Sequence, residues 1–303
     1  DDAWEMDFVW PTNDGPVPWH QRGRPTDMGH AAFLEGGVDQ RDPKPSPFTD
    51  PQQVLEFDAV REYGLPDFDQ LVDYYETWYQ RTQQACIHQV VPGGYYKTIV
   101  SGAIESFGWE MLLTAAADQD AFERVLDSYF RLTLHHARAW AKTSIEVYLN
   151  HDDMVWTAGP FMSPAFYRRV IFPRYAELWA TVKRAGKRVL FCSDGDFSMF
   201  LDDLAAAGAD GFIFEPVMDL DDIIRRFGQT HVIVGSKVDC RTLTFGTPQQ
   251  ICDQIDRTLA SAMDCPGFMF AVGNHIPSNV PISNALAYFE HLSTHWHRQE
   301  AVT

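Results

Sequence analysis

Residues 188–215 read RVLFCSDGDFSMFLDDLAAAGADGFIFE, and this stretch decides the fold class. Its two short apolar runs, 188–191 and 211–214, are typical of buried strands. Between them, 200–207 has apolar residues at helical spacing, and Gly208 follows as a helix stop. A strand, a helix and a second strand in this order predict one unit of a parallel sheet.

The same alternation continues on both sides of this unit. Upstream, 145–149 is a strand candidate, and Ser163 with Pro164 opens a helix that should end near Gly186. Downstream come a helix at 220–227, a strand at 231–235, a helix at 247–262, a strand at 267–272 and a helix at 282–292. Weaker strand candidates at 4–10 and 96–100 bring the total to about eight, which predicts a (β/α)8 barrel of the TIM type. A doubly wound sheet is the alternative, although no Gly-x-Gly-x-x-Gly follows these strands.

The first part of the chain has a different character. Up to about Pro66 it is rich in Pro, Gly and Asp, with turn-forming stretches at 10–16 and 42–47. We expect a loop-rich lead-in over 1–66 that wraps the barrel, and a single domain over 1–303. After the lead-in, helical periodicity predicts helices at 68–85, 104–117 and 121–142.

Composition limits the classes of protein to which the chain can belong. Of 303 residues, 42 are Asp or Glu and 24 are Lys or Arg, for a formal net charge of −18. Such a surface repels phosphate groups, so binding to nucleic acid or to an anionic membrane is disfavoured. We expect neither a transmembrane helix nor a signal peptide, because no apolar run is long enough and the N-terminus has no basic region. Five cysteines without a Cys-x-x-Cys pair favour a reduced, cytoplasmic protein.

Polar side chains follow five successive predicted strands. In a (β/α)8 barrel, the loops after the carboxyl ends of the strands build the active site. The residues at these positions are Asp152 and Asp153, Cys192 and Asp194, Glu215, Asp239, and Asn274 with His275. Any single one could cap a helix, as Asp and Asn often do, but five successive strands ending this way indicate a functional rim.

Three of these residues have the chemistry of a metal site. Cys192 and Asp194 follow one strand and His275 follows the last. A thiolate, a carboxylate and an imidazole can bind Zn2+ with one coordination position left open, and Glu215 offers a further oxygen. The alternative is that Cys192 packs as a small apolar side chain while Asp194 caps the next helix.

From Asp152 to Ala287 the motifs resemble those of the uroporphyrinogen decarboxylase superfamily, which includes the cobalamin-dependent (corrinoid) methyltransferases. The matching segments are Asp152-Asp153, GPFMSP at 159–164, GKRVLFCSDGD at 186–196, GADG at 208–211, Glu215-Pro216, GTP at 246–248 and GNHIP at 273–277. The resemblance implies a (β/α)8 barrel, in agreement with the strand pattern. Members usually have an additional segment before the point that resembles Asp1, which implies an incomplete N-terminal unit here.

The resemblance also implies a cofactor and a partner. Methyltransferases of the superfamily bind Zn2+ through His-x-Cys after one strand and a Cys after the last. The zinc holds a thiol as the thiolate, which accepts a methyl group from a methyl-corrinoid on a partner protein. In this chain the three positions are Cys192, Asp194 and Asn274, which all depart from that pattern. His275 could replace the last ligand, and an oxygen-rich metal site could replace the thiol-rich one.

The resemblance implies that the chain would be a corrinoid-dependent methyltransferase with a thiol or folate acceptor. Its metal ligands would be Cys192, Asp194 and His275, and its candidate catalytic residues are Asp152, Asp153, Glu215 and Asp239. The partners would be a small-molecule substrate and a corrinoid protein, and a homo-oligomer is compatible with this hypothesis.

The decarboxylases of the superfamily supply the alternative activity, a carboxy-lyase reaction without a metal. They grip substrate carboxylates with Arg-Gln-Ala-Gly-Arg, and Gln21-Arg22-Gly23-Arg24 is similar but one residue short. Arg22, Arg24 and Asn274 are therefore candidate substrate-binding residues, with a solvated loop as the alternative for the two arginines. Few basic residues occur at the predicted rim, which disfavours a porphyrinogen with its many carboxylates. A non-catalytic ligand-binding homologue is the third hypothesis.

Overall fold

The computed structural model describes residues 6–10, 13–17, 32–33, 39–40, 46–96, 98–273 and 275–295. These residues form two compact units. The larger unit contains the described residues of 6–17 and 46–213, and the smaller one contains 32–33, 39–40 and 214–295. The single domain expected over 1–303 stays a prediction.

The larger unit alternates strands with helices. Its first helices are α2 (Pro51–Leu55), α3 (Ala59–Tyr63) and α4 (Phe68–Ala85). There follow β3 (Gly93–Tyr95), α5 (Ile99–Phe107), α6 (Trp109–Ala115), α7 (Gln119–Ala141), β4 (Val147–His151), α8 (Pro164–Phe166), the π-helix η2 (Tyr167–Ile171), α9 (Phe172–Lys183), β5 (Arg188–Cys192), the 3-10 helix η3 (Ser198–Phe200), α10 (Leu201–Ala207) and β6 (Gly211–Ile213). The four strands pair in chain order, and every pair is parallel. This arrangement confirms the α/β class.

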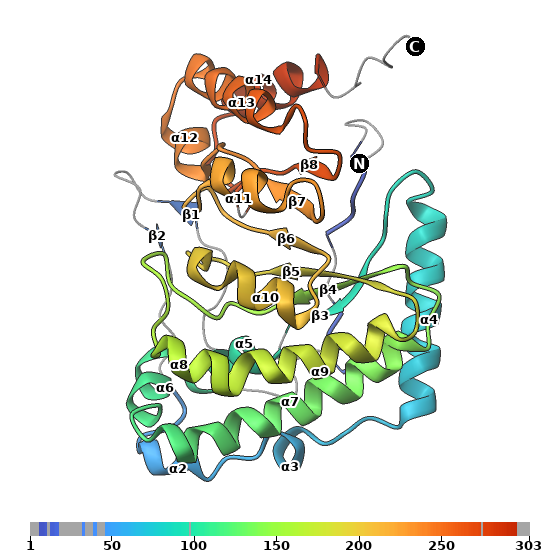
Figure 1. The fold of residues 1–303 in the computed structure, drawn as a ribbon, viewed down its shortest axis with the longest axis vertical. Coiled ribbons are helices and arrows are strands. Elements are labelled where there is room, and N and C mark those ends of the chain that lie inside the picture. The colour runs from blue at the N-terminus through green and yellow to red at the C-terminus, as the bar shows by residue number, and fades with distance from the viewer. Residues whose placement is uncertain are drawn as a thin grey trace. The chain divides into compact units, whose positions relative to one another are not determined.

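Helices α7 and α9 pack against each other along one face of this sheet (Figure 1). The side chains between sheet and helices are aromatic and buried. Tyr175 stacks on Trp179 with ring centroids 5.0 Å apart, and Phe191 of β5 lies 5.6 Å from Tyr175. Because side chains alternate along a strand, Cys192 points to the opposite face of the sheet. His151, which pairs with Cys192 in the sheet, therefore lies on the face away from α7 and α9.

Two strand predictions need correction. The strand predicted at 96–100 is wrong, because β3 ends at Tyr95 and α5 begins at Ile99. The strand predicted at 145–149 is shifted by two residues and extends to His151. The shift moves His151 from a loop into the sheet, where its direction is fixed by the pleat.

The helix predicted at 104–117 is two helices. Gly108 has a φ of 75°, a left-handed conformation that favours glycine, and it ends α5 and precedes α6. The strand candidate at 4–10 lies partly outside the described residues, and Phe8 forms an isolated parallel bridge with Val90. Within the described helices, none has the length and apolar character of a membrane span.

The smaller unit contains a parallel pair of strands and four helices among its described residues. Its elements are β1 (Ala32–Phe33), β2 (Asp39–Gln40), α11 (Leu220–Phe227), β7 (Val232–Gly235), α12 (Cys240–Phe245), α13 (Pro248–Ala262), β8 (Phe268–Phe270) and α14 (Ile282–Ser293). β7 and β8 are parallel, whereas β1 and β2 are antiparallel. Helix α13 begins as its sequence predicts, with a capping box between Thr247 and Gln250.

Candidate functional site

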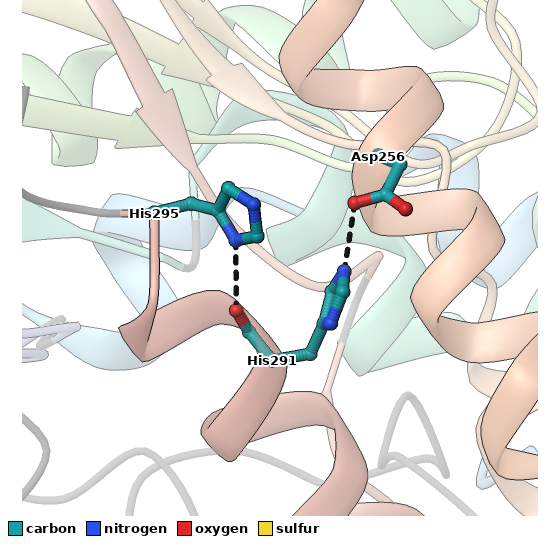
Figure 2. Close-up of side chains that lie close together, drawn as sticks. All are labelled: Asp256, His291 and His295. Atoms are coloured by element: carbon teal, nitrogen blue, oxygen red, sulfur yellow. Dashed lines mark hydrogen bonds and ion pairs between the residues drawn. The ribbon is translucent and has the colours of Figure 1, made fainter.

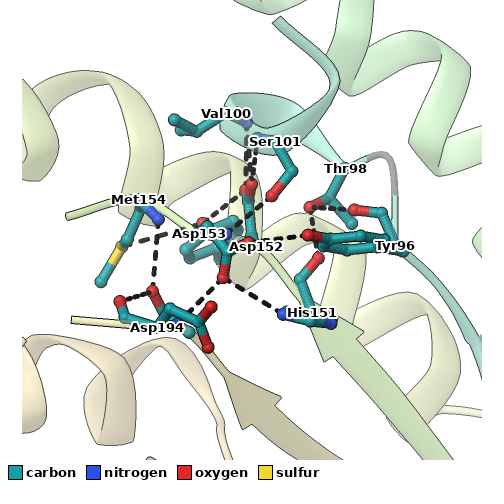
Figure 3. Close-up of polar contacts among 11 residues, drawn as sticks. Tyr96, Thr98, Val100, Ser101, His151, Asp152, Asp153, Met154 and Asp194 are labelled. Atoms are coloured by element: carbon teal, nitrogen blue, oxygen red, sulfur yellow. Dashed lines mark hydrogen bonds and ion pairs between the residues drawn. The ribbon is translucent and has the colours of Figure 1, made fainter. Parts of the chain in front are cut away.

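Two groups of His and Asp side chains bring potential ligand atoms together in the described part of the chain. One, in the smaller unit, consists of Asp256, His291 and His295 (Figure 2). The other, in the larger unit, consists of His151, Asp153 and Asp194 (Figure 3). The second group lies at the carboxyl ends of β4 and β5, where the sequence predicts a functional rim. We call it the strand-end cluster.

The strand register explains how the strand-end cluster forms. His151 of β4 is directly opposite Cys192 of β5, and Tyr95 of β3 is opposite Asn150. The next residue of the chain, Tyr96, therefore reaches the level of His151. Their rings stack with centroids 4.1 Å apart, and Trp10 meets the His151 ring edge-on at 5.7 Å. The imidazole is held between aromatic rings, which fixes its plane.

Asp153 is the centre of the cluster, and three groups bind its carboxylate. His151 Nε2 lies 3.1 Å from Oδ1, the backbone N–H of Asp194 donates to Oδ1 at 2.9 Å, and the Tyr96 hydroxyl donates to Oδ2 at 2.9 Å (Figure 3). Burial alone would raise the pKa of Asp153, but His151 and the hydrogen-bond donors outweigh burial and hold this pKa well below its usual range, at about 2. Asp153 is therefore an anion whose position is fixed.

Tyr96 keeps its proton. Burial and the adjacent negative charge of Asp153 both raise the pKa of the Tyr96 hydroxyl, because each disfavours a phenolate. The hydroxyl therefore acts as a donor to Asp153.

Asp194 lies on a tight turn after β5. The Ser193 hydroxyl donates to the Asp194 carbonyl at 2.9 Å and accepts from the backbone N–H of Met154 at 3.2 Å. Gly195 has a φ of 80°, and a Cβ there would lie 2.5 Å from the Trp156 carbonyl oxygen, so the turn requires glycine. The backbone N–H of Asp196 donates to the same carbonyl at 2.9 Å. These contacts hold the half-buried Asp194 against Asp153.

Asp152 has a different role from Asp153. Its side chain is fully buried and points toward the start of α5, where it accepts from the N–H groups of Val100 at 3.0 Å and Ser101 at 2.6 Å. The Tyr175 hydroxyl donates to Oδ2 at 2.6 Å. Burial raises the pKa of Asp152, and these donors oppose that rise. Thr98 is at the N-cap position of α5, but its side chain makes no capping bond. Asp152, which follows β4, supplies the cap instead.

The donor set of the strand-end cluster fits a divalent cation. The ligand atoms of His151, Asp153 and Asp194 all lie within 4.8 Å of one another. Two donors on one zinc ion, each about 2.1 Å away, are at most about 4.2 Å apart, so small side-chain rotations would close the set. One imidazole and two carboxylates form an oxygen-rich set that suits Zn2+ or Mn2+. Cys192 is buried next to His151 on the adjacent strand.

Other predicted site residues lie in the smaller unit. Glu215 and His275 are half-buried, and the His275 carbonyl accepts from the Cys240 thiol. The Asp239 carboxylate caps α12 by accepting from the N–H of Arg241. Their assignment to one site with the strand-end cluster stays a prediction. Arg22, Arg24 and Asn274 lie outside the described residues, and their substrate-binding role stays a prediction as well.

Comparison with known proteins identifies the family. The family model described as uroporphyrinogen decarboxylase (URO-D) matches residues 99–295, which is more than half of the chain. The chain belongs to the URO-D family. A curated uroporphyrinogen decarboxylase from Pseudoalteromonas atlantica is 27% identical over 92 residues, which are 30% of this chain and 25% of that protein. The match to this relative thus spans only about a quarter of its length.

A solved structure shows the same fold as this URO-D family chain. A methyltransferase from Methanosarcina mazei superposes with a TM-score of 0.57 and 17% identity, over 87% of this chain and 75% of that chain. A D-psicose 3-epimerase from Clostridium cellulolyticum is a more distant likeness, with a TM-score of 0.42, 10% identity and coverage of 82% and 93%. The superfamily and the α/β fold class that the motifs from Asp152 onward predict are confirmed.

Sequence reasoning missed two residues at the strand-end cluster, His151 and Tyr96. His151 lies two residues beyond the end of the strand predicted at 145–149, so the sequence pattern assigns it no role. With β4 extended to His151, the period of two along a strand puts His151 and Asp153 on one face. That spacing is the signal that could have found His151. Tyr96 follows a three-residue strand that the sequence does not mark.

Proposed function

We propose that this URO-D family chain is a methyltransferase of the corrinoid-dependent type. It would move a methyl group from a methyl-corrinoid, carried by a partner protein, to a thiol or folate acceptor. The observation that carries the proposal is the strand-end cluster: Asp194 stands where the resembling methyltransferases have a zinc-binding Cys, and it meets His151 and Asp153. The URO-D family match and the methyltransferase-like fold support the same class of enzyme.

A divalent cation held by His151, Asp153 and Asp194 would stabilise the acceptor thiol as its thiolate, which is the nucleophilic form. The residues suit this task because Asp153 is already an anion and its position is fixed by Tyr96 and by the backbone of Asp194. The proton between His151 Nε2 and Asp153 Oδ1 is the one that cation binding would displace.

The chain's own residues would divide the remaining work. Asp194 is less buried than His151 or Asp153, so it is the member of the cluster that a substrate can reach. The proton that the thiol releases would leave to solvent. Methyl transfer from a corrinoid would form a carbon–sulfur bond while the carbon–cobalt bond breaks and leaves its electron pair on cobalt. Tyr96 and Trp10 keep the His151 ring in place during this step.

The proposal is tested by methyl transfer and metal content measured together. Untagged protein, purified without chelator, is incubated anaerobically with methylcobalamin and a panel of small thiols or tetrahydrofolate. We expect loss of the methylcobalamin absorbance, with about one equivalent of metal in the cluster. Asp194→Ala should lose that metal and slow the reaction by about 100-fold or more.

Asp203→Ala is the matched control for this experiment. It removes a carboxylate from α10 in the same unit, where Asp203 pairs with Arg168 on the surface. It should keep both metal and activity. Wild-type protein that carries no metal and does not demethylate methylcobalamin would overturn the proposal.

The second candidate is a carboxy-lyase of the uroporphyrinogen decarboxylase type, which the curated relative favours. Incubation with uroporphyrinogen would then release carbon dioxide, without a metal and with unchanged activity in Asp194→Ala. A non-catalytic homologue would bind a corrinoid protein without turnover. The three hypotheses therefore predict different results for metal content, methyl transfer and carbon dioxide release.

A further inference from the structure

The second His–Asp group lies on two packed helices of the smaller unit. Asp256 is on α13, and His291 is in the last turn of α14. His291 Nε2 is 2.7 Å from Asp256 Oδ1 (Figure 2). His295 follows four residues after His291, one position beyond Thr294, the C-cap of the helix. All three residues are at least partly exposed, so solvent reaches them.

The hydrogen bonds of His295 decide which of its ring nitrogens is a ligand. Nδ1 lies 3.0 Å from the backbone carbonyl oxygen of His291. A carbonyl oxygen only accepts, and the Thr294 hydroxyl, 2.7 Å from Nδ1, donates its own proton to the same carbonyl at 2.8 Å, so Nδ1 carries the proton in both contacts. The lone pair of the neutral ring is then on Nε2, which Figure 2 shows on the side toward Asp256. A backbone bond that fixes the tautomer in this way is typical of metal-binding histidines.

A surface ion pair is the simpler explanation for two of the three residues. It accounts for the contact between Asp256 and His291. The ion pair does not account for His295. The hydrogen bond of Nδ1 leaves the lone pair of this ring on Nε2, and the ligand atom of His295 lies within 4.8 Å of those of Asp256 and His291. Two imidazoles four residues apart, with a carboxylate from a facing helix, form the donor set of a transition-metal site.

We propose that Asp256, His291 and His295 bind a divalent transition metal of the Zn2+ class. The cation takes the place of the proton between His291 Nε2 and Asp256 Oδ1, and that proton leaves to solvent. Two imidazoles, one carboxylate and a water molecule complete four-coordinate geometry. This site is separate from the proposed methyl transfer and does not depend on it.

The bound metal would link two helices that the core already joins. Ile255 of α13 and Tyr288 of α14 belong to one buried apolar cluster in the smaller unit. Asp256 and His291 follow these residues along the helices and face solvent. The metal therefore bridges α13 and α14 on the solvent side of that apolar cluster, and its role is to hold the end of α14 in place.

The test is zinc titration of the untagged full chain by calorimetry, with thermal unfolding measured beside it. We expect His291→Ala and His295→Ala each to bind about one equivalent less Zn2+ than the wild type, or to bind it about 10- to 100-fold more weakly. Zinc should raise the unfolding midpoint of the wild type, and each variant should lose that rise. The His295 variant decides the question if His291→Ala does not fold, because His295 lies beyond the helix.

The control is His88→Ala, which removes an exposed histidine from the larger unit. It should bind Zn2+ like the wild type. The same number of equivalents and the same affinity in wild type, His291→Ala and His295→Ala would overturn the proposal. So would equal losses in His88→Ala, since they would indicate non-specific binding to surface histidines.

Discussion

Asp152 and Asp153 directly follow the carboxyl end of β4. Their side chains are identical, but their environments are opposite. Burial dominates at Asp152 and raises its pKa, whereas His151 and hydrogen-bond donors hold the pKa of Asp153 low. The difference follows from the pleat, which directs one carboxylate toward α5 and the other toward Tyr96. The sequence marks the pair but not this division, because it does not show which face each residue takes.

The low pKa of Asp153 predicts a pH dependence of stability. The unfolded pKa of an Asp is about 3.9, and the folded value here is about 2. The stabilisation is therefore complete above about pH 4 and is lost as the pH falls from there toward 2. Urea unfolding of wild type and Asp153→Asn should show a difference in unfolding free energy near pH 6 that shrinks toward pH 3. A constant difference over this range would contradict the ionised state of Asp153.

The Tyr96 hydroxyl provides a second prediction at this scale. Tyr96→Phe removes the donor to Asp153 Oδ2 and should lower the unfolding free energy by about 1–2 kcal/mol. The loss should be accompanied by a rise in the pKa of Asp153, seen as an upward shift of the acid limb of unfolding. Tyr74→Phe, at a half-buried position of α4, is the control and should shift neither quantity.

At the scale of elements, the alternation of strands and helices was predictable because each element has its own periodicity and its own stop signals. Gly208 ends α10, and the capping box at Thr247 opens α13, as their sequences indicate. The short strand β3 was misplaced because three residues, two of them glycines, have no periodicity to detect. His151 was assigned no role for a related reason, since a two-residue shift of β4 decides its face.

The cap that Asp152 supplies to α5 is worth more than an ordinary cap. Asp152→Ala would leave the N–H groups of Val100 and Ser101 and the Tyr175 hydroxyl without their acceptor in a buried place. We expect a loss of about 3 kcal/mol or more in unfolding free energy. Asp118→Ala removes the local cap of α7 and should cost only about 1 kcal/mol. Equal losses in denaturant unfolding would show that the Asp152 contacts add nothing beyond local capping.

At the scale of the whole molecule, the two His–Asp groups belong to different compact units. Sequence reasoning expected one rim at which residues of both units meet, because a (β/α)8 barrel collects all its strand ends. The described geometry brings together only the candidates from β4 and β5, and Glu215, Asp239 and His275 remain predictions. Sites without shared partners should respond independently to mutation.

Independence of the two sites gives a prediction about metal content. Asp194→Ala and His291→Ala should each lower the number of bound zinc equivalents by about one, and the double variant by about two. Plasma mass spectrometry after equilibrium dialysis against buffered Zn2+ measures all four proteins. A double variant that loses no more metal than either single variant would mean that one site accounts for both losses.

The capping of α5 by Asp152 has a consequence for how ligand binding can be observed. The amide protons of Val100 and Ser101 are held by the residue that immediately precedes Asp153. A ligand that tightens the strand-end cluster must also restrict the opening of the first turn of α5. Hydrogen–deuterium exchange at these two amides would then slow when a cation or substrate binds, so a backbone turn that supplies no ligand atom reports the occupancy of the cluster.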